Sequence, residues 1–348
     1  LLHLDLHLEV LHRCLSDPPV EIEGVRPQVL VPGGLLVGAH VNGGLPAAAG
    51  PLAVLVQQAG VPLVGPHRHA LRVGGEGRVV AVTFSSSPAT VFSPSRVPPR
   101  VMTAARRASE LESAGVDEVV ELETTPELLA READPFIRDL VSRFQVSHLV
   151  EGRDFRFGKG RQGDFSLLKQ VGSQMGFEVH AIEPVEVALT DGSMVPARSS
   201  MVRRLLEQGR VRDAACVLGR PWMAEGEVVQ GHQRGRTIGC PTANLATGNL
   251  ILPRDGVYAG LAHAPDGQTF PAAVSVGTNP TFEDDARSCE AHLLGFEGLI
   301  GDYGWRLSIE LLHWVREQLV YDDLDLLKQA IRHDLARVES LLSRHSSR

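Results

Sequence analysis

The sequence predicts two domains of different fold classes, an α/β domain followed by an all-β domain. From 79 to 185, short β-branched runs alternate with helical patterns, which is typical of a doubly wound parallel sheet. After Gly209, short strand patterns succeed one another with turn residues between them and no long helix until the end, which indicates an antiparallel barrel or sandwich. We place the boundary within 209–221 and predict domains over 1–209 and 210–348.

The first domain is predicted from four strand patterns separated by helices. The apolar, β-branched run VVAVTF at 79–84 is typical of a buried parallel strand. A helix over 103–115 ends at Gly115, and further helices are predicted over 126–144 and 165–176. The remaining strands are predicted at 116–122, 147–152 and 177–185.

The second domain is predicted from five short strand patterns and one terminal helix. The strands are expected at 226–231, 256–264, 269–277, 289–296 and 305–315. In the terminal helix, apolar residues recur at steps of three and four: Leu324, Leu327, Ile331, Leu335, Val338 and Leu342. This spacing forms one apolar stripe, which we expect to dock on the barrel.

Composition excludes several classes of protein. The net charge of −8 over 348 residues argues against a protein that coats nucleic acid. The four cysteines form no C-x-x-C pair, which favours reduced thiols in the cytoplasm: Cys14, Cys216, Cys240 and Cys289. The apolar region 29–65 is too interrupted for a membrane span, and the N-terminus lacks the pattern of a signal peptide. We therefore expect a cytoplasmic protein with no nucleic-acid or membrane partner; its oligomeric state is left open.

A polar, glycine-rich stretch, GEVVQGHQRGRTIGCPTANL, follows the first strand of the second domain. Its glycines let phosphate approach the main chain: Gly231, Gly235 and Gly239. Arg234 and Arg236 match phosphate charge, while Thr242 and Asn244 offer neutral oxygens suited to a hard cation such as Mg²⁺. Taken alone, the stretch is equally compatible with a β-turn carrying solvated arginines.

Two further patterns carry candidate chemistry. Glu290 lies on an alternating strand, where it is either solvated or, beside a phosphate site, a general base for a hydroxyl nucleophile. The loop 152–164 interleaves basic residues with Phe155 and Phe157, a composition that can stack a planar ring and neutralise phosphate. Single-stranded RNA is a rival ligand for this loop, and a solvated loop anchored in the core by two phenylalanines is the structural alternative.

Together these motifs resemble one family. The glycine-rich stretch is followed in order by GVYAG, VGTNPTF, E-A-HLL-F, GDYG and LHWVRE…LLKQAI. This order resembles the riboflavin kinase module of the bacterial bifunctional riboflavin kinase/FMN adenylyltransferase (FAD synthetase) family. Upstream, VSHLVEGRDFRFGKGRQGDFSLLKQ resembles that family's adenylyltransferase domain, with LGRPW at the junction. The resemblance implies a Rossmann-like nucleotidyltransferase domain and a six-stranded antiparallel riboflavin kinase barrel with a terminal helix.

The resemblance also implies residue roles in the barrel. Thr242 and Asn244 would ligate Mg²⁺, or Mn²⁺ or Zn²⁺ in its place, together with the phosphates of ATP. The phosphate loop would consist of Gly231, Arg234, Gly235, Arg236 and Gly239. Glu290 would accept the proton of the ribityl 5′-hydroxyl, and Arg316 and Tyr321 would lie near the flavin. Family members often carry R-x-E-x-K-F here, whereas this chain has Gln318 and Val320.

In the first domain, the resemblance implies that the flavin-side loop is kept while nucleotide-side positions depart. The flavin side would be formed by Asp154, Phe155, Phe157 and Arg161. The family's G-N-F-D-G-V-H-x-G-H is not kept: Leu45 and Ala47 stand about where its histidines belong. Ser85 and Ser87 replace the Asp and the His of T-F-D-P-H-P, and Met201 replaces the Thr of S-S-T-x-x-R. We expect a domain that keeps its fold but has poor or no adenylyl transfer.

The expected function is therefore an ATP-dependent riboflavin kinase that makes FMN and ADP. The substrates would be the small molecules riboflavin and ATP. One alternative is a bifunctional enzyme that also adenylylates FMN to FAD. A second alternative, from another class, is a non-catalytic flavin-binding regulator.

Overall fold

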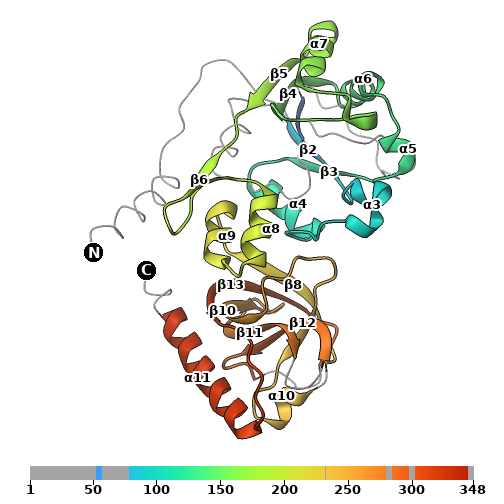
Figure 1. The fold of residues 1–348 in the computed structure, drawn as a ribbon. Coiled ribbons are helices and arrows are strands. Elements are labelled where there is room, and N and C mark those ends of the chain that lie inside the picture. The colour runs from blue at the N-terminus through green and yellow to red at the C-terminus, as the bar shows by residue number, and fades with distance from the viewer. Residues whose placement is uncertain (1–51, 57–77, 232, 280–283, 298–301, 344–348) are drawn as a thin grey trace. The chain divides into compact units, whose positions relative to one another are not determined.

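The structure, a computed structural model, describes residues 52–56, 78–231, 233–279, 284–297 and 302–343 (Figure 1). The chain divides into two compact units. The first comprises the residues up to Pro98 together with Ala104–Val185, and the second comprises Pro99–Thr103 together with Glu186–Arg348. The units thus divide at 185/186, earlier in the sequence than the boundary predicted at 209/210.

The first unit contains a five-stranded parallel sheet, which confirms the predicted α/β class. Its strands are β1 (Leu52–Val56), β2 (Arg78–Phe84), β3 (Glu118–Leu122), β4 (Val146–Gly152) and β5 (Glu178–Ile182). They lie in the order β3-β2-β1-β4-β5, and every neighbouring pair is parallel. The strand order therefore reverses between β1 and β4, and β1 was not predicted from the sequence.

Helices cover both faces of this sheet. They are α3 (Ala89–Phe92), α4 (Ala104–Ser113), α5 (Pro126–Leu129), α6 (Ala133–Phe144) and α7 (Phe165–Met175), with 3₁₀ turns at Pro94–Arg96 and Lys159–Arg161. One face forms a core with α6 and α7 through Phe136 and Leu168, and the other packs against α4 through Leu111. The helix predicted over 126–144 is two helices, and the first begins where the hydroxyl of Thr125 accepts the Leu128 amide at 3.3 Å.

The second unit is built on a closed six-stranded barrel. Its strands are β8 (Trp222–Val229), β9 (Ala243–Ala246), β10 (Gly256–His263), β11 (Thr269–Asn279), β12 (Asp284–Leu293) and β13 (Arg306–Arg316). They lie in the order β10-β11-β12-β9-β8-β13, and every pair is antiparallel. The six-stranded barrel is confirmed, and β9, which no strand pattern predicted, begins within the PTANL motif.

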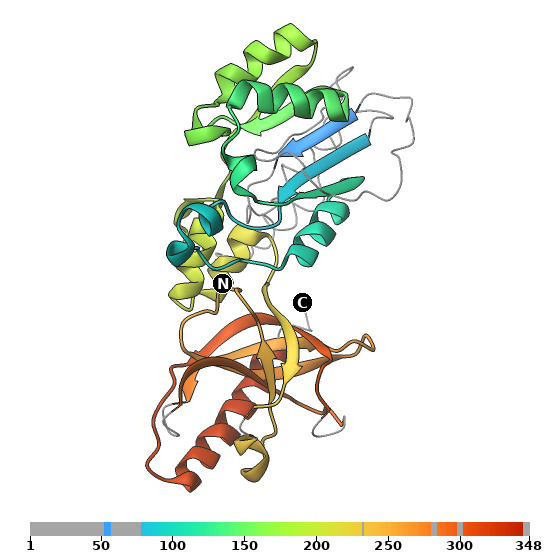
Figure 2. The ribbon, with the colours of Figure 1, turned by 90° about the vertical axis from the view of Figure 1, so that its right-hand side faces the viewer.

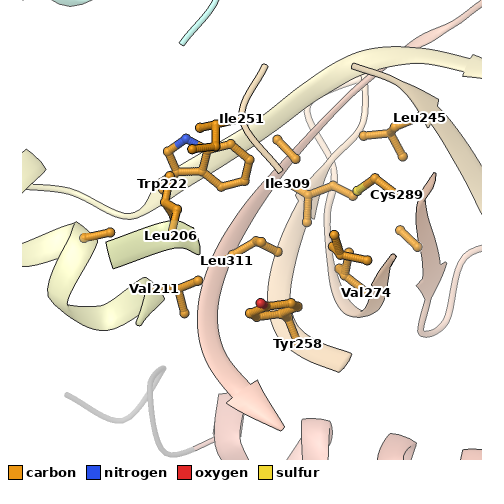
Figure 3. Close-up of a cluster of buried hydrophobic side chains, with 14 of the residues drawn as sticks. Leu206, Val211, Trp222, Leu245, Ile251, Tyr258, Val274, Cys289, Ile309 and Leu311 are labelled. Carbon is orange, nitrogen blue, oxygen red and sulfur yellow. The ribbon is translucent and has the colours of Figure 1, made fainter. Parts of the chain in front are cut away.

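The barrel core extends into two helices that precede the barrel in sequence. Trp222, Tyr258 and Leu311 are almost fully buried inside the barrel. Leu206 of α8 (Ser199–Glu207) and Val211 of α9 (Val211–Leu218) pack into the same cluster (Figure 3). Because this apolar surface is shared, α8 and α9 belong to the barrel unit, which explains the earlier division. The hairpin β6 (Glu186–Ala188) and β7 (Met194–Pro196) belongs to it as well.

The terminal helix α11 (Leu324–Ser343) packs along the outside of the barrel, as predicted (Figures 1 and 2). Its contact is made by the C-terminal half, where Val338 and Leu342 are buried against strands β10 and β13. Leu324, at the start of the predicted stripe, is 51% exposed and takes no part in that core. Among the helices of the described ranges, none is long and apolar enough to cross a bilayer.

Candidate functional site

The glycine-rich stretch connects β8 to β9 and contains one helical turn, α10 (Arg234–Thr237). The amide of Cys240 donates to the carbonyl of Gly235 at 2.8 Å, which closes the loop. A Cβ at position 235 would overlap the carbonyl oxygen of Cys240, and a Cβ at Gly231 would overlap the side-chain amide of Asn244. The sequence therefore needs glycine at both positions because backbone and side chains approach closely there.

The other predicted members of this loop lie around that turn. Arg236 is exposed, and Gly239 has a left-handed backbone with φ +83°. The backbone of Arg234 begins α10, whereas its side chain lies outside the described part of the structure. The loop thus has one confirmed local feature, a tight glycine-dependent turn; its phosphate contacts stay a prediction.

Three of the predicted site residues meet where β9 pairs with β12. The Thr242 hydroxyl donates to Oε2 of Glu290 at 3.0 Å, although the two residues are 48 positions apart. Asn244 stands directly opposite Glu290 in the β9–β12 register. The Ser288 hydroxyl donates to the other carboxylate oxygen, Oε1, at 3.3 Å. The barrel therefore brings a hydroxyl, an amide and a carboxylate to one place.

This donor set suits a hard cation. A threonine hydroxyl has one proton and two lone pairs, and because Thr242 donates its proton to Glu290, both lone pairs remain to accept or to ligate. The side-chain oxygen of Asn244 and the carboxylate of Glu290 complete a set of oxygen ligands. Mg²⁺ prefers such oxygens and is normally shared with substrate phosphates, so the residues present fit the predicted ATP-bound Mg²⁺.

A second polar contact lies on the other side of Glu290, and sequence reasoning missed it. Ser275 of β11 stands opposite Glu290 in the β11–β12 register. Its hydroxyl accepts a hydrogen bond from Nε2 of Gln318 at 3.1 Å. Gln318 is one of the two residues at which this chain departs from the family pattern, so this departure reaches the strand that neighbours the carboxylate. Only the strand register places Ser275 beside Glu290, and no pattern in the sequence specifies that register.

Arg316 and Tyr321, predicted near the flavin, lie next to each other beside α11. The guanidinium of Arg316 donates to both oxygens of Asp334, with Nη2 at 2.7 Å and Nε at 2.9 Å, and Asp334 is 6% exposed. The same guanidinium carbon lies 5.9 Å from the centre of the Tyr321 ring. Arg316 therefore anchors the terminal helix to β13, and its contact with a flavin stays a prediction.

Two cysteines lie next to the candidate site. Burial raises the pKa of Cys240 to about 11, and burial, with a smaller contribution from Glu290, raises the pKa of Cys289 to about 12. Both thiols therefore keep their protons at neutral pH, and because the thiolate is the nucleophilic form, neither is suited to nucleophilic catalysis. Together with Cys216, they are free thiols, as predicted for the described cysteines.

In the first unit, the four predicted flavin-side residues separate into two pairs. Phe155 and Phe157 are buried in the core, where their rings stack with centroids 5.2 Å apart. Asp154 and Arg161 are exposed. The buried rings fit the structural alternative of a loop anchored by two phenylalanines, and flavin contact by all four residues stays a prediction.

One residue of this unit was not singled out from the sequence. Glu151 is the last residue but one of β4, near the point where the strand order reverses, which is where open α/β sheets usually bind ligands. Its Oε2 accepts the Gly152 amide at 2.9 Å, while its Oε1 has no hydrogen-bond partner among the described residues. Burial, with a smaller contribution from Asp154, raises the pKa of this carboxyl well above its usual value.

The nucleotide-side departures are described in part. Leu45 and Ala47 lie outside the described residues. The side-chain oxygen of Ser85, just after β2, accepts the Thr124 amide at 3.2 Å, and that of Ser87 accepts the Ala89 amide at 3.3 Å. Met201, on α8, packs against the barrel core. The two serines thus lie just beyond β2, at the edge where the parallel strands end.

Comparisons with known proteins agree with this division into two sites. A family model described as "Riboflavin kinase" matches residues 218–342, and one described as "FAD synthetase" matches 71–194. Bifunctional riboflavin kinase/FMN adenylyltransferase from Pseudomonas fluorescens is 36% identical, covering 75% of this chain and 81% of that protein. The protein of the same description from Escherichia coli K12 is 33% identical, covering 74% and 80%.

A solved structure shares the fold of most of the chain. It is described as a macrolide-efflux protein from Streptococcus pneumoniae, and it matches with a TM-score of 0.69 and 26% identity, covering 85% of this chain and 95% of that one. The word "efflux" in that description refers to the Streptococcus pneumoniae protein and not to this chain.

An α/β unit matched as FAD synthetase and a barrel matched as riboflavin kinase place the chain in a class of two-domain, flavin-processing transferases. The relatives, at up to 36% identity over most of their length, are specific enough to identify the family. The chain belongs to the bifunctional riboflavin kinase/FMN adenylyltransferase family. Because those relatives are named for both activities, the comparisons do not support the expectation that adenylyl transfer is lost.

Proposed function

We propose that the barrel unit transfers the γ-phosphate of ATP to the 5′-hydroxyl of riboflavin, giving FMN and ADP. This reaction needs positioning and charge neutralisation more than covalent help from the protein. The glycine-dependent loop between β8 and β9 supplies main-chain amides near the phosphates. Thr242 and Asn244 hold the cation that the phosphates share, and the cation supplies charge neutralisation when it is bound.

In this proposal Glu290 is the general base. Its Oε2 is held by Thr242 and its Oε1 by Ser288, so the carboxylate is oriented before a substrate arrives. The 5′-hydroxyl of riboflavin gives its proton to this carboxylate as its oxygen bonds to the γ-phosphorus and the bond to the β-bridging oxygen breaks. ADP then leaves with that bridging oxygen, and the proton passes from Glu290 to solvent.

The observation that carries the proposal is the hydrogen bond between Thr242 and Glu290. It joins a predicted cation ligand to the predicted base across 48 residues of sequence, through a strand pairing that also brings in Asn244. A solvated strand glutamate, the alternative interpretation, would not need partners on both carboxylate oxygens.

Chromatography of the products tests the proposal directly. Purified chain with riboflavin, ATP and Mg²⁺ should form ADP in an amount equal to the sum of FMN and any FAD made from it, and omission of Mg²⁺ should stop this. Folded protein that binds riboflavin without consuming ATP would favour the alternative of a non-catalytic flavin-binding regulator and would contradict the proposal.

A second function, adenylyl transfer from ATP to FMN, is favoured by the match of residues 71–194 to the FAD synthetase model. We propose that the first unit carries this activity. FMN with ATP should then give FAD and pyrophosphate, and pyrophosphate release separates this reaction from the kinase reaction. The serines at 85 and 87 make the rate informative: Ser85→Asp with Ser87→His should accelerate FAD formation if the family's side chains stabilise the transferring phosphate.

A further inference from the structure

Two histidines and a glutamate converge on one point of the first unit's sheet. His148 is on β4, and Glu178 and His180 are on the neighbouring edge strand β5. His148 pairs with Glu178 in the parallel register, and His180, two residues further on, faces the same side of the sheet. Neither the kinase proposal nor the adenylyl-transfer proposal uses any of these residues.

The three ligand atoms form a nearly equilateral triangle. Nδ1 of His148 lies 3.3 Å from Nε2 of His180. Oε2 of Glu178 lies 3.4 Å from the first nitrogen and 3.5 Å from the second. Around a tetrahedral Zn²⁺, with ligand distances of about 2.0–2.2 Å, the ligand atoms are separated by about 3.3–3.6 Å. All three measured separations fall within this range.

Hydrogen bonds alone satisfy such a triangle poorly. Each edge needs a donor facing an acceptor, but the carboxylate only accepts, and each ring nitrogen is either a donor or an acceptor. If both nitrogens donate to Glu178, the edge between them joins two donors 3.3 Å apart, with no acceptor on either side. If one nitrogen is unprotonated, it faces the carboxylate oxygen with no proton between them. A single cation inside the triangle satisfies all three edges at once.

We propose that His148, Glu178 and His180 form a binding site for a Zn²⁺-class transition-metal ion. Two imidazoles and one carboxylate are ligands that such ions accept, whereas Mg²⁺ and Ca²⁺ prefer oxygen alone. Three protein ligands leave the fourth tetrahedral position to water or to an exogenous ligand. The ion would join the edge strand β5 to β4, and the 64% exposure of the Glu178 side chain provides access from solvent.

Cobalt titration of the full-length, untagged chain tests this site. Co²⁺ is added to chelator-treated protein in excess Mg²⁺, which fills sites built from oxygen ligands, such as the one proposed in the barrel. We expect one equivalent of Co²⁺ to give the strong visible absorption of tetrahedral coordination, and Zn²⁺ to displace it. Zn²⁺ should also slow amide hydrogen exchange in the peptides of β4 and β5.

Variants assign the signal to these residues. His148→Gln and His180→Gln should each weaken Co²⁺ binding at least tenfold, because even loss of an outer-shell partner costs about 10–100-fold. Glu178→Gln, at an exposed position, should retain the fold while weakening binding and changing the spectrum. The control is the double variant His67→Gln/His69→Gln, which removes two imidazoles, one more than either single variant, and should bind as the parent does.

Three results would overturn the proposal. The first is the absence of a tetrahedral cobalt spectrum in folded protein. The second is an unchanged affinity in both histidine variants, with circular dichroism and riboflavin phosphorylation showing that they are folded. The third is a thiolate-to-cobalt charge-transfer band, which would assign the ion to a cysteine.

Discussion

The barrel unit and the first unit place their predicted site residues in opposite ways. In the barrel, Thr242 and Asn244 are far from Glu290 in sequence but meet it through one hydrogen bond and one strand pairing. In the first unit, Phe155 and Phe157 are near neighbours of exposed residues, yet their rings are buried in the core. Strand register brings polar groups together without a need for burial. An aromatic ring in a loop can bind a ligand or pack in the core, so its presence in the sequence does not distinguish the two roles.

Glu290→Gln should produce the largest effect on activity and tests whether the residues that meet in the barrel form a catalytic site. The amide keeps the size of the carboxylate but cannot take the proton of a hydroxyl, so riboflavin phosphorylation should fall by about 10²–10⁴-fold. Steady-state FMN formation measures this, and riboflavin binding should persist. Glu310→Gln, a carboxylate of the same barrel paired with His263, is the matched control and should retain activity. Unchanged turnover in Glu290→Gln would reject its role as base.

Phe157→Ala tests whether that ring serves the core of the first unit. The ring is 2% exposed and lies 6.1 Å from the Phe136 ring, so its removal should cost about 3–5 kcal/mol of unfolding free energy. All three tryptophans lie in the second unit: Trp222, Trp305 and Trp314. Hydrogen exchange in first-unit peptides should therefore rise while the tryptophan fluorescence transition stays in place.

Arg161→Ala is the partner experiment on the exposed side of the same loop. Its side chain is exposed, so stability should change by less than about 0.5 kcal/mol. If this loop holds a flavin, FMN affinity should fall nonetheless, which fluorescence titration measures. A variant with parental FMN affinity would leave the loop with a structural role alone.

Gly231→Ala tests the position of Asn244, the proposed cation ligand in the barrel, because the added methyl group should move it. The added Cβ would overlap the Asn244 side chain, and a displacement of about 1 Å in a positioning residue costs about 10²-fold in rate. FMN formation should fall by that order while adenylyl transfer from supplied FMN continues. Gly267→Asn is the control, because a Cβ there meets nothing within 4 Å and asparagine tolerates the left-handed backbone of this turn. Equal losses in both variants would point to a general effect on folding.

The sequence predicted regular elements well where hydrophobic runs are long. The runs at 79–84 and 305–315 became Arg78–Phe84 and Arg306–Arg316. Short elements were missed: β9 has four residues and includes the end of the PTANL motif, and β6 and β7 have three residues each. Their patterns are too brief for periodicity to indicate a strand, because pairing with neighbours decides their structure.

The candidate site likewise contains residues that the sequence predicted and residues that only the strand pairing reveals. Thr242, Asn244 and Glu290 were named through a resemblance in motif order, and the structure supplies the hydrogen bond and the pairing that join them. Ser275, which faces Glu290 from the opposite strand, depended on register and was missed. Glu151 was missed because burial of a carboxylate beside a loop is a property of the packed sheet, not of local sequence.

Glu151→Gln is the smallest expected effect and examines the first unit through pH. Because burial raises the folded-state pKa of Glu151, the folded chain keeps a proton that the unfolded chain releases above about pH 4.3. The stability of the parent unit should therefore fall as pH rises through the folded-state pKa. The glutamine variant has no such proton, so first-unit peptides should exchange more slowly than in the parent at pH 7, with no difference near pH 4. Glu183→Gln, at an exposed carboxylate, is the control. A gain in protection of equal size at both pH values would mean that packing, and not the titration of Glu151, is responsible.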